Sequence, residues 1–79
     1  MTQEYLTRLR VYAWELARGN LQVTVSDDEA GLLSVAATQE SGGLQPLSIR
    51  AAMKFSNLTE ARLFIARVIE QARKAHAAR

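Results

Sequence analysis

Few residues of this chain have side chains suited to catalysis or metal binding. His76 is the only histidine, and the chain contains no cysteine. A histidine acts as a base or a metal ligand when a carboxylate or a second ligand orients its ring. The surrounding sequence, KAHAAR, supplies neither group. We therefore interpret His76 as a solvated or structurally satisfied side chain.

The densest run of acids is Asp27, Asp28 and Glu29. Three adjacent acids lack the spacing and the glycine of a calcium loop, and carboxylates that act as acid or base need burial. The run continues as DDEAG, which is typical of a turn. The SGG at 41–43 has no lysine or helix start after it, as a phosphate-binding loop would require. The sequence thus favours a non-enzymatic protein with no metal and no cofactor.

The residues best suited to binding lie on a helix predicted over 3–18. Its apolar residues share one side: Tyr5, Leu6, Leu9, Tyr12, Ala13, Leu16 and Ala17. Trp14 and Val11 fall outside this arc, and Arg10 and Arg18 lie four residues before and after Trp14. Trp and Arg are enriched at binding hot spots, whereas a tryptophan can also cover the edge of a core beneath arginine stems. Both interpretations of Trp14 stay open.

A second helix is predicted after Asn57, because Asn57 and Glu60 have the spacing of a capping box. Its apolar positions again gather on one side: Leu58, Ala61, Phe64, Ile65, Val68, Ile69, Ala72 and Ala75. Leu63 lies off that side. If Leu63, Trp14 and Val11 are close in space, they form an apolar patch suited to another protein or to a second copy in a homodimer.

Nucleic-acid binding is the alternative function. The candidate contacts are basic residues of the third predicted strand and the last helix: Arg50, Lys54, Arg62, Arg67, Arg73 and Lys74. The net charge is only +2, from ten basic and eight acidic residues. Glu70 lies within helical reach of Arg67, Arg73 and Lys74, so an ion-paired, solvated face is the competing interpretation. The outward face of the predicted sheet also lacks aromatic residues on which bases could stack.

Between the helices, the hydrophobic period changes to two. The segments LQVTVS, LLSVAATQE and LSIRAAMKF predict three strands, with inward residues Leu21, Val23 and Val25, then Leu33, Val35 and Ala37, then Leu47, Ile49, Ala51, Met53 and Phe55. Pro46 is expected at the entry of the third strand. The turns at 27–31 and 41–43 are short enough for antiparallel pairing. We expect one α+β domain over 1–79, in the order α-β-β-β-α, with a three-stranded antiparallel meander and both helices packed on one face.

This order is also that of double-stranded-RNA-binding domains, but the residues that make contacts in that family do not match. The loop DDEAG replaces a Gly-Pro-x-His loop, and the last helix opens with SNLTEAR in place of a lysine cluster. No apolar run reaches the length of a membrane span, and no secretory signal is visible, so we expect a cytoplasmic protein. The leading hypothesis is a small bacterial or phage accessory protein, such as an inhibitor, that occupies the surface of a partner protein.

Overall fold

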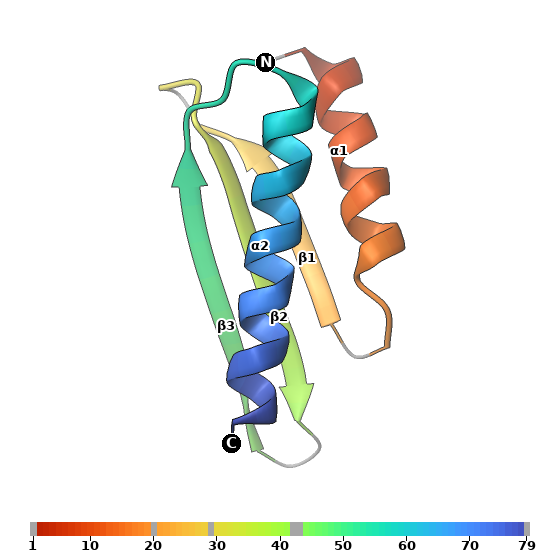
Figure 1. Ribbon diagram of the computed structural model, residues 1–79, viewed down its shortest axis with the longest axis vertical. Helices are drawn as coiled ribbons and strands as arrows, with labels where there is room; N and C mark the ends of the chain where they lie inside the picture. The colour runs from red at the N-terminus through yellow and green to blue at the C-terminus, as the bar shows by residue number, and fades with distance from the viewer. Residues whose placement is uncertain (1, 20, 29, 42–43, 79) are drawn as a thin grey trace.

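The computed structural model describes residues 2–19, 21–28, 30–41 and 44–78. The chain forms helix α1 (Gln3–Leu16), strands β1 (Leu21–Asp27), β2 (Leu33–Ser41) and β3 (Leu44–Met53), and helix α2 (Leu58–Ala77) (Figure 1). The predicted α-β-β-β-α order is confirmed. The first helix ends earlier than predicted, because Ala17 leaves the helical conformation with ψ 89° and Gly19 takes the positive φ of 76° that a glycine allows.

The three strands form one antiparallel sheet in the order β1-β2-β3. Val35 lies opposite Val25 on one side and Ala51 on the other, so odd-numbered residues share the face that carries the core. β3 begins at Leu44, and Pro46 therefore lies inside the strand instead of at its entry. The missing N–H of proline is tolerated there because β3 is an edge strand.

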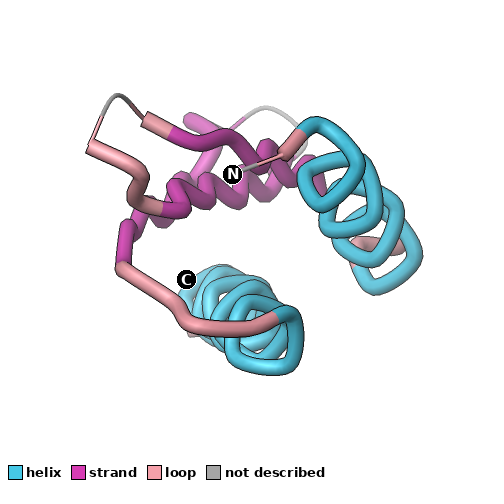
Figure 2. The backbone as a smooth tube through the Cα atoms, turned by 90° about the horizontal axis from the view of Figure 1, so that it is seen from above, coloured by secondary structure: helices cyan, strands magenta, loops and turns pink. Residues whose placement is uncertain are grey.

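Both helices pack on the same face of the sheet. Figure 2 shows α2 across this face and α1 beside the end of the sheet that carries β1. Their inward residues close a single core with the odd-numbered strand residues: Leu6, Leu9, Ala13, Leu21, Val25, Leu33, Val35, Ala37, Ala61, Ile65, Val68, Ile69 and Ala72. One expectation was wrong: Tyr5 is 39% exposed, because it lies at the edge of the apolar side of α1, whereas its neighbour Leu6 is buried.

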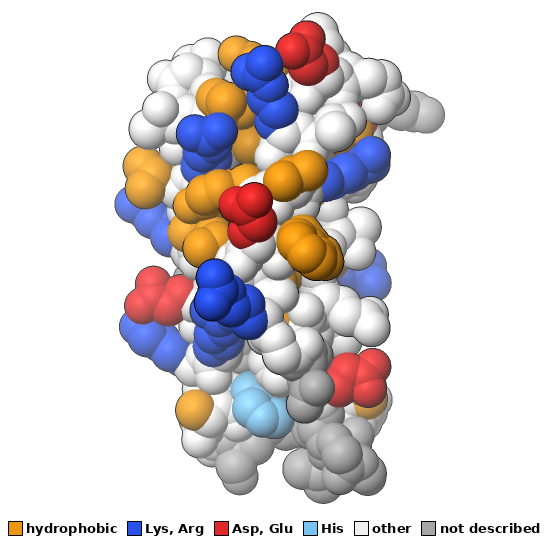
Figure 3. All heavy atoms as spheres, turned by 90° about the vertical axis from the view of Figure 1, so that its right-hand side faces the viewer, with side chains coloured by type: hydrophobic (Ala, Val, Ile, Leu, Met, Phe, Trp, Pro, Cys, Tyr) orange, Lys and Arg blue, Asp and Glu red, His pale blue; other side chains and the backbone are white. Residues whose placement is uncertain are grey.

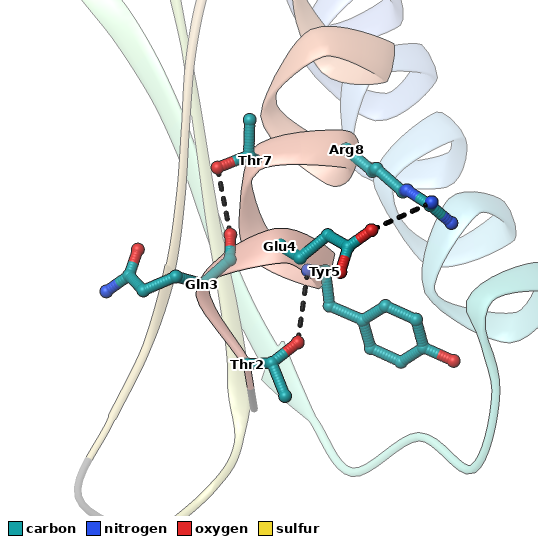
Figure 4. Close-up of polar contacts among 6 residues, drawn as sticks. All are labelled: Thr2, Gln3, Glu4, Tyr5, Thr7 and Arg8. Atoms are coloured by element: carbon teal, nitrogen blue, oxygen red, sulfur yellow. Dashed lines mark hydrogen bonds and ion pairs between the residues drawn. The ribbon is translucent and has the colours of Figure 1, made fainter.

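Side-chain caps begin both helices. At α1 the Thr2 hydroxyl accepts a hydrogen bond from the Tyr5 N–H at 3.2 Å, and Arg8 forms an ion pair with Glu4 at 3.0 Å (Figure 4). At α2 the Asn57 side chain accepts from the Glu60 N–H at 2.9 Å, as predicted. These acceptors satisfy N–H groups that the first helical turn leaves without a backbone partner.

The second half of the capping box differs from the expected pattern. The Glu60 carboxylate accepts from the Ser56 N–H at 2.7 Å and from the Ser56 hydroxyl at 2.8 Å, one residue before the N-cap. The backbone N–H of Ser56, and to a lesser degree its hydroxyl, lower the pKa of the Glu60 carboxyl from its ordinary value of 4.5. Glu60 therefore holds the connection between β3 and α2 through its ionised form.

The predicted turn between β1 and β2 is confirmed, although Asp27 still belongs to β1. The Asp28 carboxylate accepts from the backbone N–H groups of Ala30 at 3.0 Å and Leu32 at 2.8 Å. Gly31 has a φ of 81°, and its N–H bonds to the Asp28 carbonyl at 3.0 Å. This acid therefore has a structural use in the turn. Glu29, and the glycines at 42 and 43 of the predicted second turn, lie outside the described residues.

Across the described part of the chain, neither helix combines the length and the apolar character needed to cross a membrane.

Candidate protein-interaction surface

Trp14 is the most exposed large apolar side chain among the described residues. Its exposed fraction is 78%, whereas Leu9 and Ala13 on the same helix are at 0% and 1%. Val11, three residues before Trp14, is 51% exposed. The helical phase inferred from the sequence is thus confirmed, and the indole projects away from the core.

Two arginines beside Trp14 are held by backbone carbonyls. The Arg10 Nε–H donates to the Val25 carbonyl of edge strand β1 at 2.9 Å, and the Arg18 Nε–H donates to the Glu15 carbonyl at 3.4 Å. Each guanidinium retains other N–H groups that can donate to a carboxylate. We call Arg10, Val11, Trp14 and Arg18 the Trp14 surface. Both guanidinium groups therefore have a backbone partner before any other protein binds, and the Arg10 bond is the shorter of the two.

Two surface hollows border the Trp14 surface. One lies at the C-terminal end of α1 and is lined by Trp14, Glu15, Ala17, Arg18 and Gly19. The other is lined from α1 and α2 by Thr7, Arg8, Val11, Tyr12, Glu15 and Arg62. Figure 3 looks onto the α1 side of the molecule, where hydrophobic side chains are exposed between basic and acidic ones. The surface can therefore pair an apolar contact with charged ones.

Leu63 is 55% exposed on α2, as its position off the apolar side predicted. The helical spacing places it on the same outer side of α2 as Arg67 and Glu70, both of which are exposed. The hollow beside Val11 is completed from α2 by Arg62 and not by Leu63. No contact described in the structure joins Leu63 to the Trp14 surface.

Three of the six basic residues of the nucleic-acid alternative interact within the protein. The Arg62 guanidinium lies 5.6 Å from the centre of the Tyr12 ring, Arg73 donates to the Leu16 carbonyl at 2.6 Å, and Lys74 pairs with Glu70 at 3.1 Å. The Lys74–Glu70 pair was expected from the sequence. Arg50, Lys54 and Arg67 are exposed; Arg50 lies on the side of the sheet away from the helices, and Lys54 directly follows the end of β3.

The contacts of Arg62 and Arg73 were not anticipated from the sequence. Both residues join α2 to α1. Arg62 and Tyr12 are 50 positions apart along the chain, and Arg73 and Leu16 are 57 positions apart. Spacing within one helix can identify ion pairs such as Lys74–Glu70, but it contains no information about which residue of another helix lies opposite. Glu15 was also missed, although it lines both hollows, the first together with Arg18 and the second together with Arg8 and Arg62.

His76 is half-buried near the end of α2 and takes part in a polar or electrostatic interaction within the protein. Among residues 2–19, 21–28, 30–41 and 44–78, no group of three His, Cys, Asp or Glu residues is placed to hold a metal ion.

The geometry therefore defines a small α+β domain with an exposed tryptophan between two anchored arginines. Comparison of the chain with protein-family models, with curated proteins and with solved structures found no match.

Proposed function

We propose that this protein is a non-enzymatic interaction module whose Trp14 surface binds another protein. The observation that carries the proposal is the 78% exposure of Trp14 between Arg10 and Arg18. Burying an indole of this exposure in a partner contributes of order 3–5 kcal/mol before the costs of association. Few other exposed groups of a small domain offer so much apolar area.

The anchoring of the arginines also supports the proposal. Arg10 and Arg18 are already tied to the carbonyls of Val25 and Glu15, so less side-chain freedom is lost when a partner binds. A complementary partner would present an apolar recess for the indole with carboxylates at its rim. Charged groups of this kind favour the correct partner and speed its encounter.

The biological role that follows is occupation of a partner's surface in the cytoplasm. A bacterial or phage accessory protein, such as an inhibitor, acts in this way without its own reaction chemistry. Pairing of two Trp14 surfaces in a homodimer is the competing use of the same residues, and a two-fold axis would then place each indole against the partner copy.

The experiment is site-specific photocrosslinking followed by measurement of affinity. A photoreactive residue at position 14 is compared with one at Gln22 of β1, which is exposed on the side of the sheet away from the helices. A partner captured only from position 14 is then purified and titrated with Trp14→Ala, Arg18→Ala and the control Arg67→Ala.

We expect Trp14→Ala to weaken binding by 2 kcal/mol or more, about 30-fold, and Arg67→Ala to leave it unchanged. Leu63→Ala distinguishes a surface confined to α1 from one that reaches α2. Equal affinities for Trp14→Ala and the unaltered protein would remove the indole from the interface and overturn the proposal.

A further inference from the structure

The two edges of the sheet are covered differently. Helix α1 lies beside edge strand β1, and the Arg10 side chain bonds to the Val25 carbonyl on that strand. β3 forms the other edge. In Figure 1 no described element lies along its outer side. Over 47–53 its outward backbone N–H and C=O groups are therefore available for a further strand.

Apolar side chains beside the β3 edge are incompletely covered. Leu47, Ile49, Ala51 and Met53 face the core side of the sheet but are only half-buried. On the central strand, in contrast, Val35 and Ala37 are fully buried. Phe64 of α2 is also half-buried and packs against the core. Every second side chain of an added strand would point to this face of the sheet and could pack against these apolar residues.

On the opposite face, the β3 edge is positively charged. Arg50 is exposed there, the exposed Lys54 directly follows the last residue of the strand, and the segment 44–56 contains no acidic residue. The neighbouring strand places no acid opposite Arg50, because Ala36 lies opposite it and Ser34 lies opposite Ala52. Acidic side chains of an added strand would lie next to these two cations.

We propose that the β3 edge binds an extended acidic peptide segment of another protein by β-strand addition. Main-chain hydrogen bonds to 47–53 hold the segment. Its alternate apolar side chains pack beside Ile49, Met53 and Phe64, and its alternate carboxylates face Arg50 and Lys54. Pro46 has no N–H and sets the limit of the pairing at the start of β3.

A second copy of this chain fits the edge less well. Antiparallel pairing of two β3 strands brings Arg50 and Lys54 of one copy near the same cations of the other in several registers, and like charges opposite each other are destabilising. An acidic segment has the opposite charge in every register. The charge of the edge therefore selects the peptide.

The test uses the intact ¹⁵N-labelled protein and a short, end-capped peptide of alternating valine and glutamate, titrated by NMR. We expect the backbone amides of 47–53 to shift, while those of α1 do not. A peptide with lysine in place of glutamate should bind about threefold to tenfold more weakly, as two exposed ion pairs imply. A peptide with proline at its centre should lose binding, because it cannot complete the ladder.

Charge reversal on the protein supplies the matched variant. Arg50→Glu combined with Lys54→Glu should invert the preference, so that the lysine peptide binds more tightly than the glutamate peptide. Both residues are exposed, and retention of the amide spectrum elsewhere verifies that the double variant folds. Unchanged preference in this variant would overturn the role of the two cations.

Absence of shifts at 47–53 up to about 1 mM glutamate peptide, a concentration that detects even weak segments, would overturn the site. Shifts at 47–53 that grow with protein concentration, without peptide, would identify a second copy as the occupant and also overturn the proposal. The site is independent of the proposed function, since Trp14→Ala should leave peptide binding unchanged. Failure at one surface therefore leaves the other untouched.

Discussion

The Arg73 guanidinium of α2 donates a 2.6 Å hydrogen bond to the backbone carbonyl of Leu16 in the last turn of α1. Carbonyls of a last helical turn have no partner within their own helix. A residue 57 positions away supplies one here. The bond therefore caps the end of α1 and connects it to α2 near the Trp14 surface. Arg73, which the sequence suggested for nucleic-acid contact, thus stabilises the contact between the two helices.

We expect Arg73→Ala to lower the free energy of unfolding by about 1 kcal/mol, because a charged donor to a helix-terminal carbonyl is lost. Urea denaturation measures the change. Lys74→Ala is the matched control, since its exposed pair with Glu70 is worth no more than about 0.5 kcal/mol. Equal losses in the two variants would show that the Arg73–Leu16 bond contributes nothing of its own.

Stability should fall in acid through Glu60. Its pKa is lowered in the folded protein by the Ser56 N–H and hydroxyl, so the ionised carboxylate stabilises the fold above the ordinary value of 4.5. This contribution is lost as the pH falls through the lower pKa of the folded state. The advantage of the unaltered protein over Glu60→Gln should therefore be largest at neutral pH and shrink below about pH 4.5.

Thermal unfolding followed by circular dichroism across this range checks the expectation. Glu70→Gln, which alters an exposed acid of the same helix, serves as the control. If the difference between the unaltered protein and Glu60→Gln stays constant with pH, the charge of Glu60 does not act at this cap.

Truncations on α1 should differ sharply between its two sides. Leu9→Ala removes methyl groups from a fully buried position and should cost about 2–5 kcal/mol. Val11→Ala and Trp14→Ala alter exposed side chains and should each change the stability by no more than about 0.5 kcal/mol. Urea denaturation of the three variants measures this; a large loss in Trp14→Ala would place the indole in the core.

Association of the chain with itself is tested by sedimentation equilibrium. Under the proposed function, the Trp14 surface binds a different protein. The unaltered protein and Trp14→Ala should therefore both sediment with the mass of a monomer. A dimer that Trp14→Ala dissociates would establish the homodimer as the use of this surface. A dimer that persists in Trp14→Ala would place the contact elsewhere.

Nucleic-acid binding should be weak and sensitive to salt. Arg62, Arg73 and Lys74 already contact Tyr12, Leu16 and Glu70, and the net charge is only +2. Binding that depends on phosphate contacts falls as counterions are added. We expect no mobility shift of duplex or single strands at physiological salt. A shift that persists there and disappears in Arg50→Glu would establish the alternative function.

The sequence by itself determined the elements and the sides they bury. Trp14 lies about a third of a turn from the buried side of α1, and strict alternation placed Val35 and Ala37 inward, because helix and strand periods are local properties of the backbone. The cap at Asn57 and the turn after β1 were equally readable, since Asn57 and Asp28 both bond to N–H groups within four residues. The entry of β3 was misplaced, because Pro46 indicated the boundary of the strand, whereas an edge strand also tolerates a proline inside it.

Tertiary structure alone decided which distant residues meet. The Arg73–Leu16 bond, the Arg62–Tyr12 contact and the Arg10–Val25 bond depend on how α2 and β1 lie against α1, and no spacing along the chain encodes that. It also decided that α1 accompanies β1 and leaves the edge of β3 open. These contacts depend on how the helices and the sheet pack together around the core, so they form only in the complete fold.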